Sequence, residues 1–188
     1  MKLSLSAKAD SQSVAVRFFT SADRRKVPAS VSELEFSLAP GSRVFLHAER
    51  LLCVGIGDAG KVGSDVIRHA AGAAALTLKK AGRTKLAIHL EDWPQFVAAA
   101  VEGIVLADYR FEDFRKSNVP ALESVTVVVR SSDLAAAKEG ARRSHTISDC
   151  ANLVRGIANR PGNVVFPETL AEEAQWHEIG RASCRERV

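Results

Sequence analysis

The feature that most constrains the fold is a continuous apolar stretch that leads into a glycine-rich turn and then into a helical pattern. Residues 50–56, RLLCVGI, are nearly all apolar, which is typical of a central strand covered on both faces. From 64 to 81, small and apolar residues recur at three- and four-residue spacing, which predicts a helix. Lys79 in its last turn suits the negative end of the helix dipole, and Gly82 can cap it. A buried strand followed closely by such a helix indicates an α/β fold.

The rest of the chain continues this alternation of strands and helices. Asp92 is expected to cap a helix that has Pro94 in its first turn and Gln95 at the capping-box position. Strands are expected at 2–7, 13–19, 43–49, 85–90 and 124–129, and a long helix at about 133–158. The strand at 43–49 lies close enough to 50–56 to form a hairpin. The pattern predicts a three-layer α/β/α domain with a mixed sheet and helices on both faces.

Length and composition are those of a soluble globular protein. A chain of 188 residues with 46% hydrophobic residues can build one domain and the start of a second. No apolar run approaches the ~20 residues that span a bilayer, and no secretory signal is recognisable, which favours the cytoplasm. The cysteines at 53, 150 and 184 form no C-x-x-C pair. The net charge of +4 owes +2 to residues 181–188, three arginines against one glutamate, so charge argues little for nucleic acid.

The glycine-rich turn matches two nucleotide motifs incompletely. Residues 55–60 fit the dinucleotide fingerprint G-x-G-x-x-G, and residues 55–61 fit most of the phosphate-loop pattern. However, Val62 stands where a phosphate loop needs Ser or Thr, and Glu91 lies 31 residues beyond Gly60 instead of roughly 20. The better interpretation is a tight strand-to-helix turn. Whether the loop from Gly55 to Gly63 keeps any affinity for an anion stays open at this point.

The other groups of candidate residues favour structural roles over catalytic or ligand-binding ones. The five histidines show no metal-binding spacing, and no serine stands in a G-x-S-x-G elbow. His145 and Asp149 could face each other on a helix, where an exposed ion pair is favoured over a catalytic dyad. Residues 108–117, DYRFEDFRKS, could stack bases and hold phosphates, but Glu112 and Asp113 favour a packed loop with solvated charges. We therefore assign no catalytic, cofactor-binding or metal-binding residue.

Three segments together resemble one family. LLCVGIGD, EGIVLADYRFEDFRKS and CANLVRGIANRPGNVVFPETLAEEA occur in the order found in the N-terminal part of leucyl aminopeptidases, also called cytosol aminopeptidases, and the resemblance covers roughly residues 35–175. Gly156 departs from the family, which commonly has an acidic residue there, and Ala107 stands where Gly is usual. The third segment is the most specific, because it carries the family's interdomain junction residues Arg155, Asn159, Pro161, Asn163, Pro167, Leu170 and Ala171.

The resemblance implies a domain organisation and an activity. Residues 1–160 would form a macro-domain-like α/β domain that ends in a long linker helix, and residues 161–177 would be the junction and first helix of a catalytic domain. Family members are cytoplasmic hexameric metallopeptidases that release N-terminal residues, Leu by preference, from peptides. Two divalent ions, zinc, manganese or magnesium, activate a bridging water in them, and a lysine helps to polarise the scissile carbonyl.

The metal ligands of the family lie in segments such as Asn-Thr-Asp-Ala-Glu-Gly-Arg-Leu, which does not occur in this sequence. The chain is therefore expected to be inactive alone and to hold no cofactor itself. Residues 178–188, EIGRASCRERV, abandon the preceding amphipathic pattern and are interpreted as a non-native tail. An alternative is a stand-alone macro-like module that binds a nucleotide of the ADP-ribose type or DNA. A third possibility, a domain that only positions subunits in an oligomer, is compatible with the first.

Overall fold

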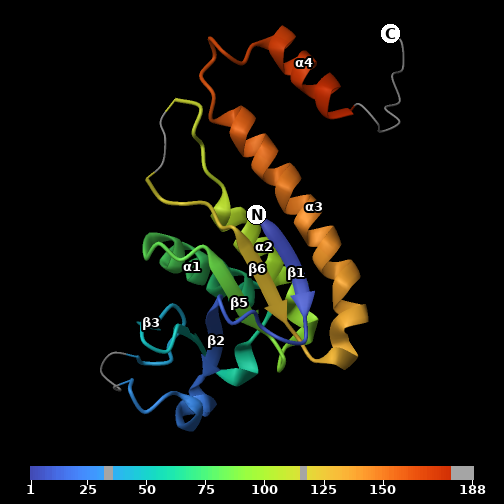
Figure 1. Ribbon diagram of the computed structural model, residues 1–188. Helices are drawn as coiled ribbons and strands as arrows, with labels where there is room; N and C mark the ends of the chain where they lie inside the picture. The colour runs from blue at the N-terminus through green and yellow to red at the C-terminus, as the bar shows by residue number, and fades with distance from the viewer. Residues whose placement is uncertain (32–35, 115–117, 179–188) are drawn as a thin grey trace. The chain divides into compact units, whose positions relative to one another are not determined.

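The computed structural model describes residues 1–31, 36–114 and 118–178. Within them the strands form one six-stranded sheet in the order β1-β6-β5-β2-β4-β3 (Figure 1). β3 runs antiparallel to β4, and every other neighbouring pair is parallel. The strands span Lys2–Ser6 (β1), Val14–Thr20 (β2), Arg43–Leu46 (β3), Leu51–Gly57 (β4), Lys85–His89 (β5) and Ser124–Val128 (β6). The predicted α/β class and mixed sheet are confirmed.

The apolar stretch that dominates the sequence forms β4, which is buried on both faces. Leu52, Val54 and Ile56 join the main core, whereas Cys53 points to a smaller cluster on the opposite face. The expected hairpin is also confirmed, because Leu46 of β3 lies opposite Leu51 of β4. A strand covered on both faces needs apolar side chains at consecutive positions, and this explains the lack of alternation in its sequence.

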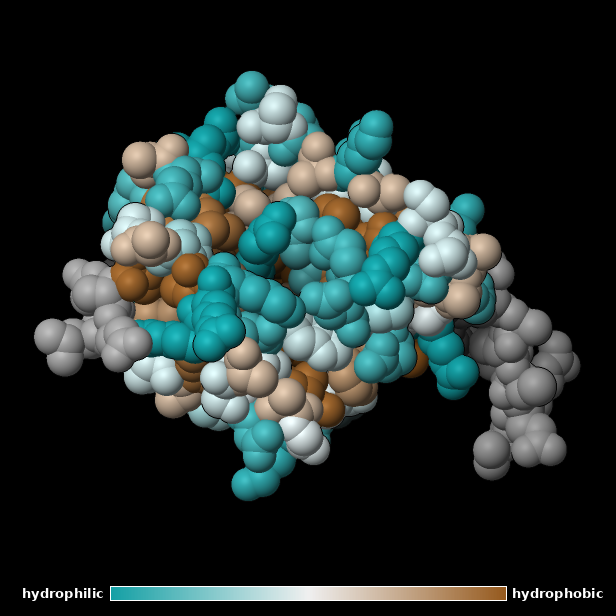
Figure 2. All heavy atoms as spheres, turned by 90° about the horizontal axis from the view of Figure 1, so that it is seen from below, coloured by the Kyte–Doolittle hydropathy of each residue, from teal (hydrophilic) through white to brown (hydrophobic). Residues whose placement is uncertain are grey.

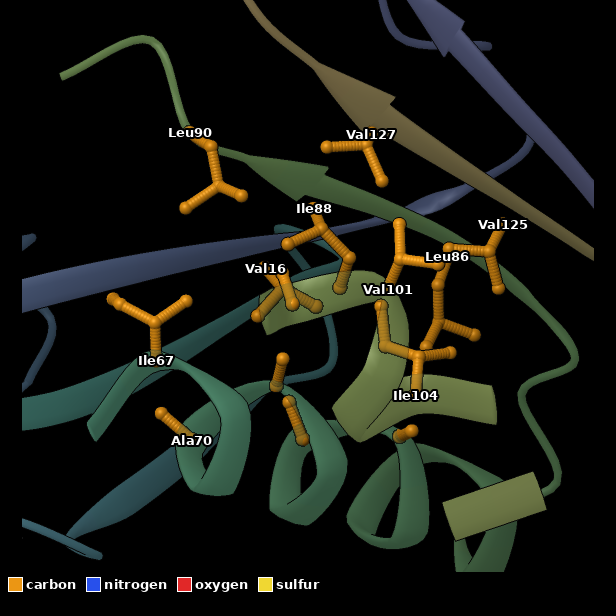
Figure 3. Close-up of a cluster of buried hydrophobic side chains, with 14 of the residues drawn as sticks. Val16, Ile67, Ala70, Leu86, Ile88, Leu90, Val101, Ile104, Val125 and Val127 are labelled. Atoms are coloured by element: carbon orange, nitrogen blue, oxygen red, sulfur yellow. The ribbon is translucent and has the colours of Figure 1, made fainter. Parts of the chain in front are cut away.

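Helices α1 (Ser64–Lys80) and α2 (Val97–Asp108) pack together over one face of the sheet. In Figure 3, Ile67 and Ala70 of α1 and Val101 and Ile104 of α2 lie beneath side chains of the central strands. α1 ends as its sequence predicts, since Gly82 adopts a φ of 70° and the Arg83 amide donates to the Leu78 carbonyl over 2.8 Å. The burial of small residues along α1 lets the two helices approach closely.

The predicted capping role of Asp92 is wrong. A short 3₁₀ turn, η3 (Pro94–Phe96), follows it, and α2 begins only at Val97 without a side-chain cap. The Asp92 carboxylate instead accepts a hydrogen bond from Arg130 over 2.9 Å. Trp93 and Phe96 both pack against the main core. The chain therefore makes a tight turn that partly buries two aromatic rings before the helix begins, and this tertiary gain outweighs the local cap.

The opposite face of β2 and β4 carries a second apolar cluster, made of Phe19, Phe36, Leu38 and Cys53. The rings of Phe19 and Phe36 meet edge to face with centroids 6.1 Å apart. A second 3₁₀ turn, η1 (Ser21–Lys26), follows β2, and Arg24 donates a hydrogen bond to the Phe36 carbonyl over 2.8 Å. The segment that includes Phe36 and Leu38 is thereby fixed against this face of the sheet.

The long helix predicted near the C-terminus is confirmed as α3 (Leu134–Ala158), which follows the 3₁₀ turn η4 (Ser131–Asp133). α4 (Pro167–Glu178) comes next. The chain divides into two compact units, Met1–Ala151 and the residues from Asn152 onward. The boundaries expected at residues 160 and 177 stay predictions. Residues 179–188, nearly all of the expected tail, lie outside the described residues, and none of the described helices is long and apolar enough to cross a membrane.

Candidate functional site

In α/β proteins with parallel strands, ligands usually bind at the carboxyl ends of the strands, where the connecting loops meet. Here the loops after β2, β4, β5 and β6 gather at that edge, which Figure 2 views from below. Hydrophilic side chains cover much of the middle of this view, with apolar patches between them. The glycine turn after β4 and the charged residues after β2 and β5 are therefore the first candidates for a site.

The glycine turn is used by the protein itself. A Cβ atom on Gly55 would lie 2.5 Å from the Ala39 carbonyl oxygen, and one on Gly57 would lie 2.8 Å from Pro40. Gly57 also has a φ of 78°, in the left-handed region that favours glycine. Residues 38–40 therefore occupy the space next to Gly55 and Gly57 that the missing side chains leave free, and a phosphate could not bind in it. The fold-making interpretation of these two glycines agrees with their contacts.

The third glycine of the motif has a different environment. A Cβ on Gly60 would touch only the Asp58 side chain, at an ordinary 3.6 Å, and Asp58 itself accepts a hydrogen bond from the Gly60 amide over 3.0 Å. That carboxylate satisfies the start of the short 3₁₀ turn η2 (Ala59–Lys61) and places a negative charge in the loop. A negative charge at this position opposes the binding of phosphate.

Charged side chains surround a small cavity of ≈ 100 Å³ after β2 and β5. His89 Nδ1 lies 2.9 Å from Glu91 Oε1, Arg130 lies 2.9 Å from Asp92, and Lys26 lies 2.8 Å from Asp23. Asp23 and Asp92 are thus neutralised by cations of the protein itself, and Glu91 is in contact with His89. A pocket for a small ligand usually has ~300–1,000 Å³, so this cavity is too small to enclose a nucleotide.

Asp23 shows how these pairs stabilise the edge. Burial acts to raise the pKa of its carboxyl group, but hydrogen bonds from Lys26 and Thr20 outweigh burial, and the pKa is lowered. The Thr20 amide and hydroxyl both donate to Asp23, the amide over 3.0 Å. Asp23 therefore caps η1 in its ionised form, which is a structural role. The hydrogen bond to Asp23 in turn raises the pKa of Lys26.

No group of three or more metal-ligating side chains occurs among residues 1–31, 36–114 and 118–178. His145 Nδ1 lies 3.0 Å from Asp149 Oδ2 on α3, the exposed ion pair expected from their spacing. Cys53 is fully buried, and burial is the main reason that its pKa is raised to about 11. A thiol with so high a pKa is not a nucleophile near neutral pH. Cys150 is exposed, and Cys184 lies outside the described residues.

The described part of the aromatic and basic segment, residues 108–114, makes several contacts within itself. Phe111 and Phe114 meet edge to face with centroids 5.7 Å apart. Arg110 pairs with Glu112 over 3.0 Å and also donates to the Val119 carbonyl. These contacts agree with the packed-loop interpretation for residues 108–114, while residues 115–117 lie outside the described part of the chain. Rings that contact each other edge to face and an arginine that is already paired are poorly placed to hold bases and phosphates.

The most strongly buried charge among the described residues was not anticipated as a site. The Lys79 side chain is only 2% exposed, and its ammonium lies 2.7 Å from Asp108 Oδ1. The same carboxylate accepts a hydrogen bond from the Leu122 amide over 3.1 Å. The sequence placed Lys79 in the last turn of α1 as a partner of the helix dipole, and no local pattern links it to a residue 29 positions away. The pair joins α1, α2 and the approach to β6, so it is structural.

The described residues thus form an α/β domain whose candidate ligand edge is filled by internal ion pairs. This fold is that of the N-terminal regions of leucine aminopeptidases. A mutant tomato leucine aminopeptidase matches 95% of the chain with a TM-score of 0.74 at 18% identity, and the chain covers 42% of it. The bottromycin maturation enzyme BotP matches 89% of the chain with a TM-score of 0.67 at 20% identity, and the chain covers 37% of it.

The sequence comparisons give the family. Residues 26–118 match the model of the cytosol aminopeptidase family, N-terminal domain. Probable cytosol aminopeptidases of Geotalea uraniireducens and Geobacter sulfurreducens are 36% and 35% identical over 138 and 136 residues, each covering 69% of the chain. The chain spans 28% and 27% of the length of these two relatives. It belongs to the cytosol aminopeptidase family, of which it carries the N-terminal domain.

Proposed function

We propose that this chain is the non-catalytic N-terminal domain of a metallopeptidase that releases N-terminal amino acids, Leu by preference, from peptides. The observation that carries the proposal is the family match over residues 26–118 together with relatives that are probable cytosol aminopeptidases. The full enzyme would be a cytoplasmic hexamer that holds two divalent ions, zinc, manganese or magnesium. In such a site the ions activate a water molecule to attack the peptide carbonyl.

The residues of this chain do not fit that metal centre. A two-metal site needs several carboxylates that converge on ions about 3.5–4 Å apart. The described residues contain no cluster of this kind, and Asp23, Glu91 and Asp92 at the carboxyl edge contact Lys26, His89 and Arg130 respectively. No catalytic step is therefore assigned to the 188 residues. Their proposed contribution is to support the subunit and its assembly.

The alternative function, a stand-alone module for an ADP-ribose-type nucleotide or for DNA, has less support. The space beneath Gly55 and Gly57 is filled by residues 38–40, and the cavity after β2 and β5 holds only ≈ 100 Å³. Calorimetry with ADP-ribose and a salt-dependent DNA shift assay test this alternative. Saturable binding of either ligand at micromolar concentration would favour it over the proposal.

The proposal is tested by comparing the 188-residue chain with a longer protein. The gene would be expressed both as residues 1–188 and as a reading frame continued through any metal-binding segments, and each product would be assayed on a leucyl amide with manganese. We expect activity only in the longer protein, and we expect a chelator to abolish it. Hydrolysis by the 188-residue chain that a chelator abolishes would refute the proposal. So would a continued reading frame that encodes no metal-binding segment.

A further inference from the structure

A further cavity lies away from the carboxyl edge, between β1 and the first half of α3. Its volume is ≈ 580 Å³, within the range of pockets that hold ligands. The apolar lining comes from Leu3 and Leu5 of β1 and from Leu134 and Ala141 of α3. We call this cavity the β1–α3 groove. Figure 1 shows α3 beside β1, which is consistent with these lining residues.

One wall of the groove is an open sheet edge. β1 is the terminal strand of the sheet and pairs only with β6. The Lys2 amide donates to Glu123 over 2.9 Å, and the Ser6 carbonyl accepts from Val129 over 3.1 Å. Because backbone groups alternate in direction along a strand, the amide and carbonyl groups of Leu3 and Leu5 point away from β6. They make no backbone hydrogen bond within the described sheet, and such an edge can accept another strand.

The other wall carries positive charge on two successive turns of α3, at Lys138 and Arg142, and His145 lines the groove one turn further on. None of the described lining residues is acidic. Arg142 pairs with Glu139 on the same helix, and both side chains are 70% exposed. Exposed pairs contribute little and exchange readily for other partners. The charge of the lining therefore complements an acidic ligand.

We propose that the β1–α3 groove binds an extended acidic segment of a partner protein by adding it as a strand to β1. The open amides and carbonyls of Leu3 and Leu5 supply backbone hydrogen bonds, the apolar floor takes alternate side chains, and Lys138 and Arg142 select carboxylates at the rim. A sheet edge beside a helix is a recurring way in which domains recognise peptides through strand addition. The inference is independent of peptidase activity, since no catalytic step is assigned to any residue of the groove.

The test measures fluorescence anisotropy of a labelled probe, acetyl-Glu-Val-Glu-Val-Glu-Val-amide, with the 188-residue chain at low salt. The comparison probe replaces each Glu by Lys. We expect saturable binding of the acidic probe that weakens as salt screens the charges, and no saturation with the basic probe. Two further probes carry N-methyl groups on one or the other alternate set of amides. Strand addition requires that one set abolishes binding and the other does not, because only every second amide faces β1.

The protein variant Lys138→Glu with Arg142→Glu is expected to bind the acidic probe about tenfold more weakly, since two attractive surface charges become repulsive. The matched control is Lys80→Glu with Arg83→Glu, which makes the same change of net charge at exposed positions outside the groove. Circular dichroism checks that both variants fold, and the N-methyl probes give an answer that does not depend on any variant.

Several results would overturn the inference. These are no saturation of the acidic probe up to about 1 mM, equal binding of both probe charges, equal loss in the control variant, or equal effects of the two N-methyl patterns. Concentration-dependent dimerisation that the acidic probe does not disrupt would also overturn it, because the occupant of the groove would then be a second copy of this chain.

Discussion

Among the described glycines in helices, Gly103 is the one whose replacement by alanine should lower the stability of the protein most. A Cβ on Gly103 of α2 would lie 2.1 Å from the Arg68 carbonyl oxygen of α1, whereas ordinary contact begins at 3.4 Å. The helices would have to separate by roughly 1.3 Å, the difference of these two distances, because a backbone carbonyl cannot rotate away as a side chain can. Overpacking of a core usually costs ~1–3 kcal/mol, and this contact belongs at the upper end.

Helix propensity offsets part of that cost, because Ala is about 1 kcal/mol better than Gly inside a helix. The expected net loss is therefore about 2 kcal/mol, which would lower the melting temperature by about 4–8 °C in a chain of this size. Urea unfolding followed by circular dichroism measures it as a lower midpoint with an unchanged slope.

Two further glycines provide a graded control. Gly140→Ala in α3 places its Cβ 3.6 Å from that of Ala98, an ordinary contact, and should leave stability unchanged or raise it by up to about 1 kcal/mol. In Gly72→Ala of α1, the new Cβ would lie 2.9 Å from the Gly103 carbonyl oxygen, and the stability of this variant should fall between those of the other two. If Gly103→Ala unfolded at the same urea concentration as Gly140→Ala, the argument from close helix approach would be refuted.

Two predictions concern the ion pairs. Lys79→Met leaves the Asp108 carboxylate, 15% exposed, without its cation and should lower the free energy of unfolding in urea by about 3 kcal/mol. Adding Asp108→Asn should recover part of this loss. A double variant that is less stable than Lys79→Met would contradict the reasoning. Asp23→Ala should cost about 1 kcal/mol at pH 7 through the lost cap of η1. Because the pKa of native Asp23 is lowered, its contribution is present above the unfolded value of 3.8 and disappears as pH falls through the native pKa. A loss as large at pH 2 as at pH 7 would rule out the ionised carboxylate as its source.

Local sequence patterns predicted most elements of this fold because each element has one dominant requirement for the pattern of its side chains. A strand buried on both faces must be apolar throughout, and 50–56 became β4. A helix over the sheet needs a periodic small and apolar face, and 64–81 became α1. The prediction failed at Asp92, where the local capping signal competed with the burial of Trp93 and Phe96. The burial of two large rings outweighs one capping hydrogen bond, and a local pattern does not reveal that competition.

Some features of the candidate site could likewise be predicted from the sequence, and others only from the structure. The sequence alone showed that the glycine motif was incomplete, through Val62 and the distant Glu91. Only the structure showed what replaces a ligand there, because residues 38–40 reach Gly55 and Gly57 from an earlier part of the chain. Likewise, His145 and Asp149 could be paired from their helical spacing, but Lys79 and Asp108 could not.

The sequence by itself determined the α/β class, the hairpin of β3 and β4 and the main helices, because these depend on side-chain periodicity and on residues close together along the chain. The family was indicated by the resemblance of three segments of the sequence. The tertiary structure alone decided the strand order that leaves β1 at an open edge and places it beside α3. It also decided which charges are buried together. Strand order and buried pairs arise from contacts between distant residues, whose free energy depends on the packing of the whole domain and not on any local pattern.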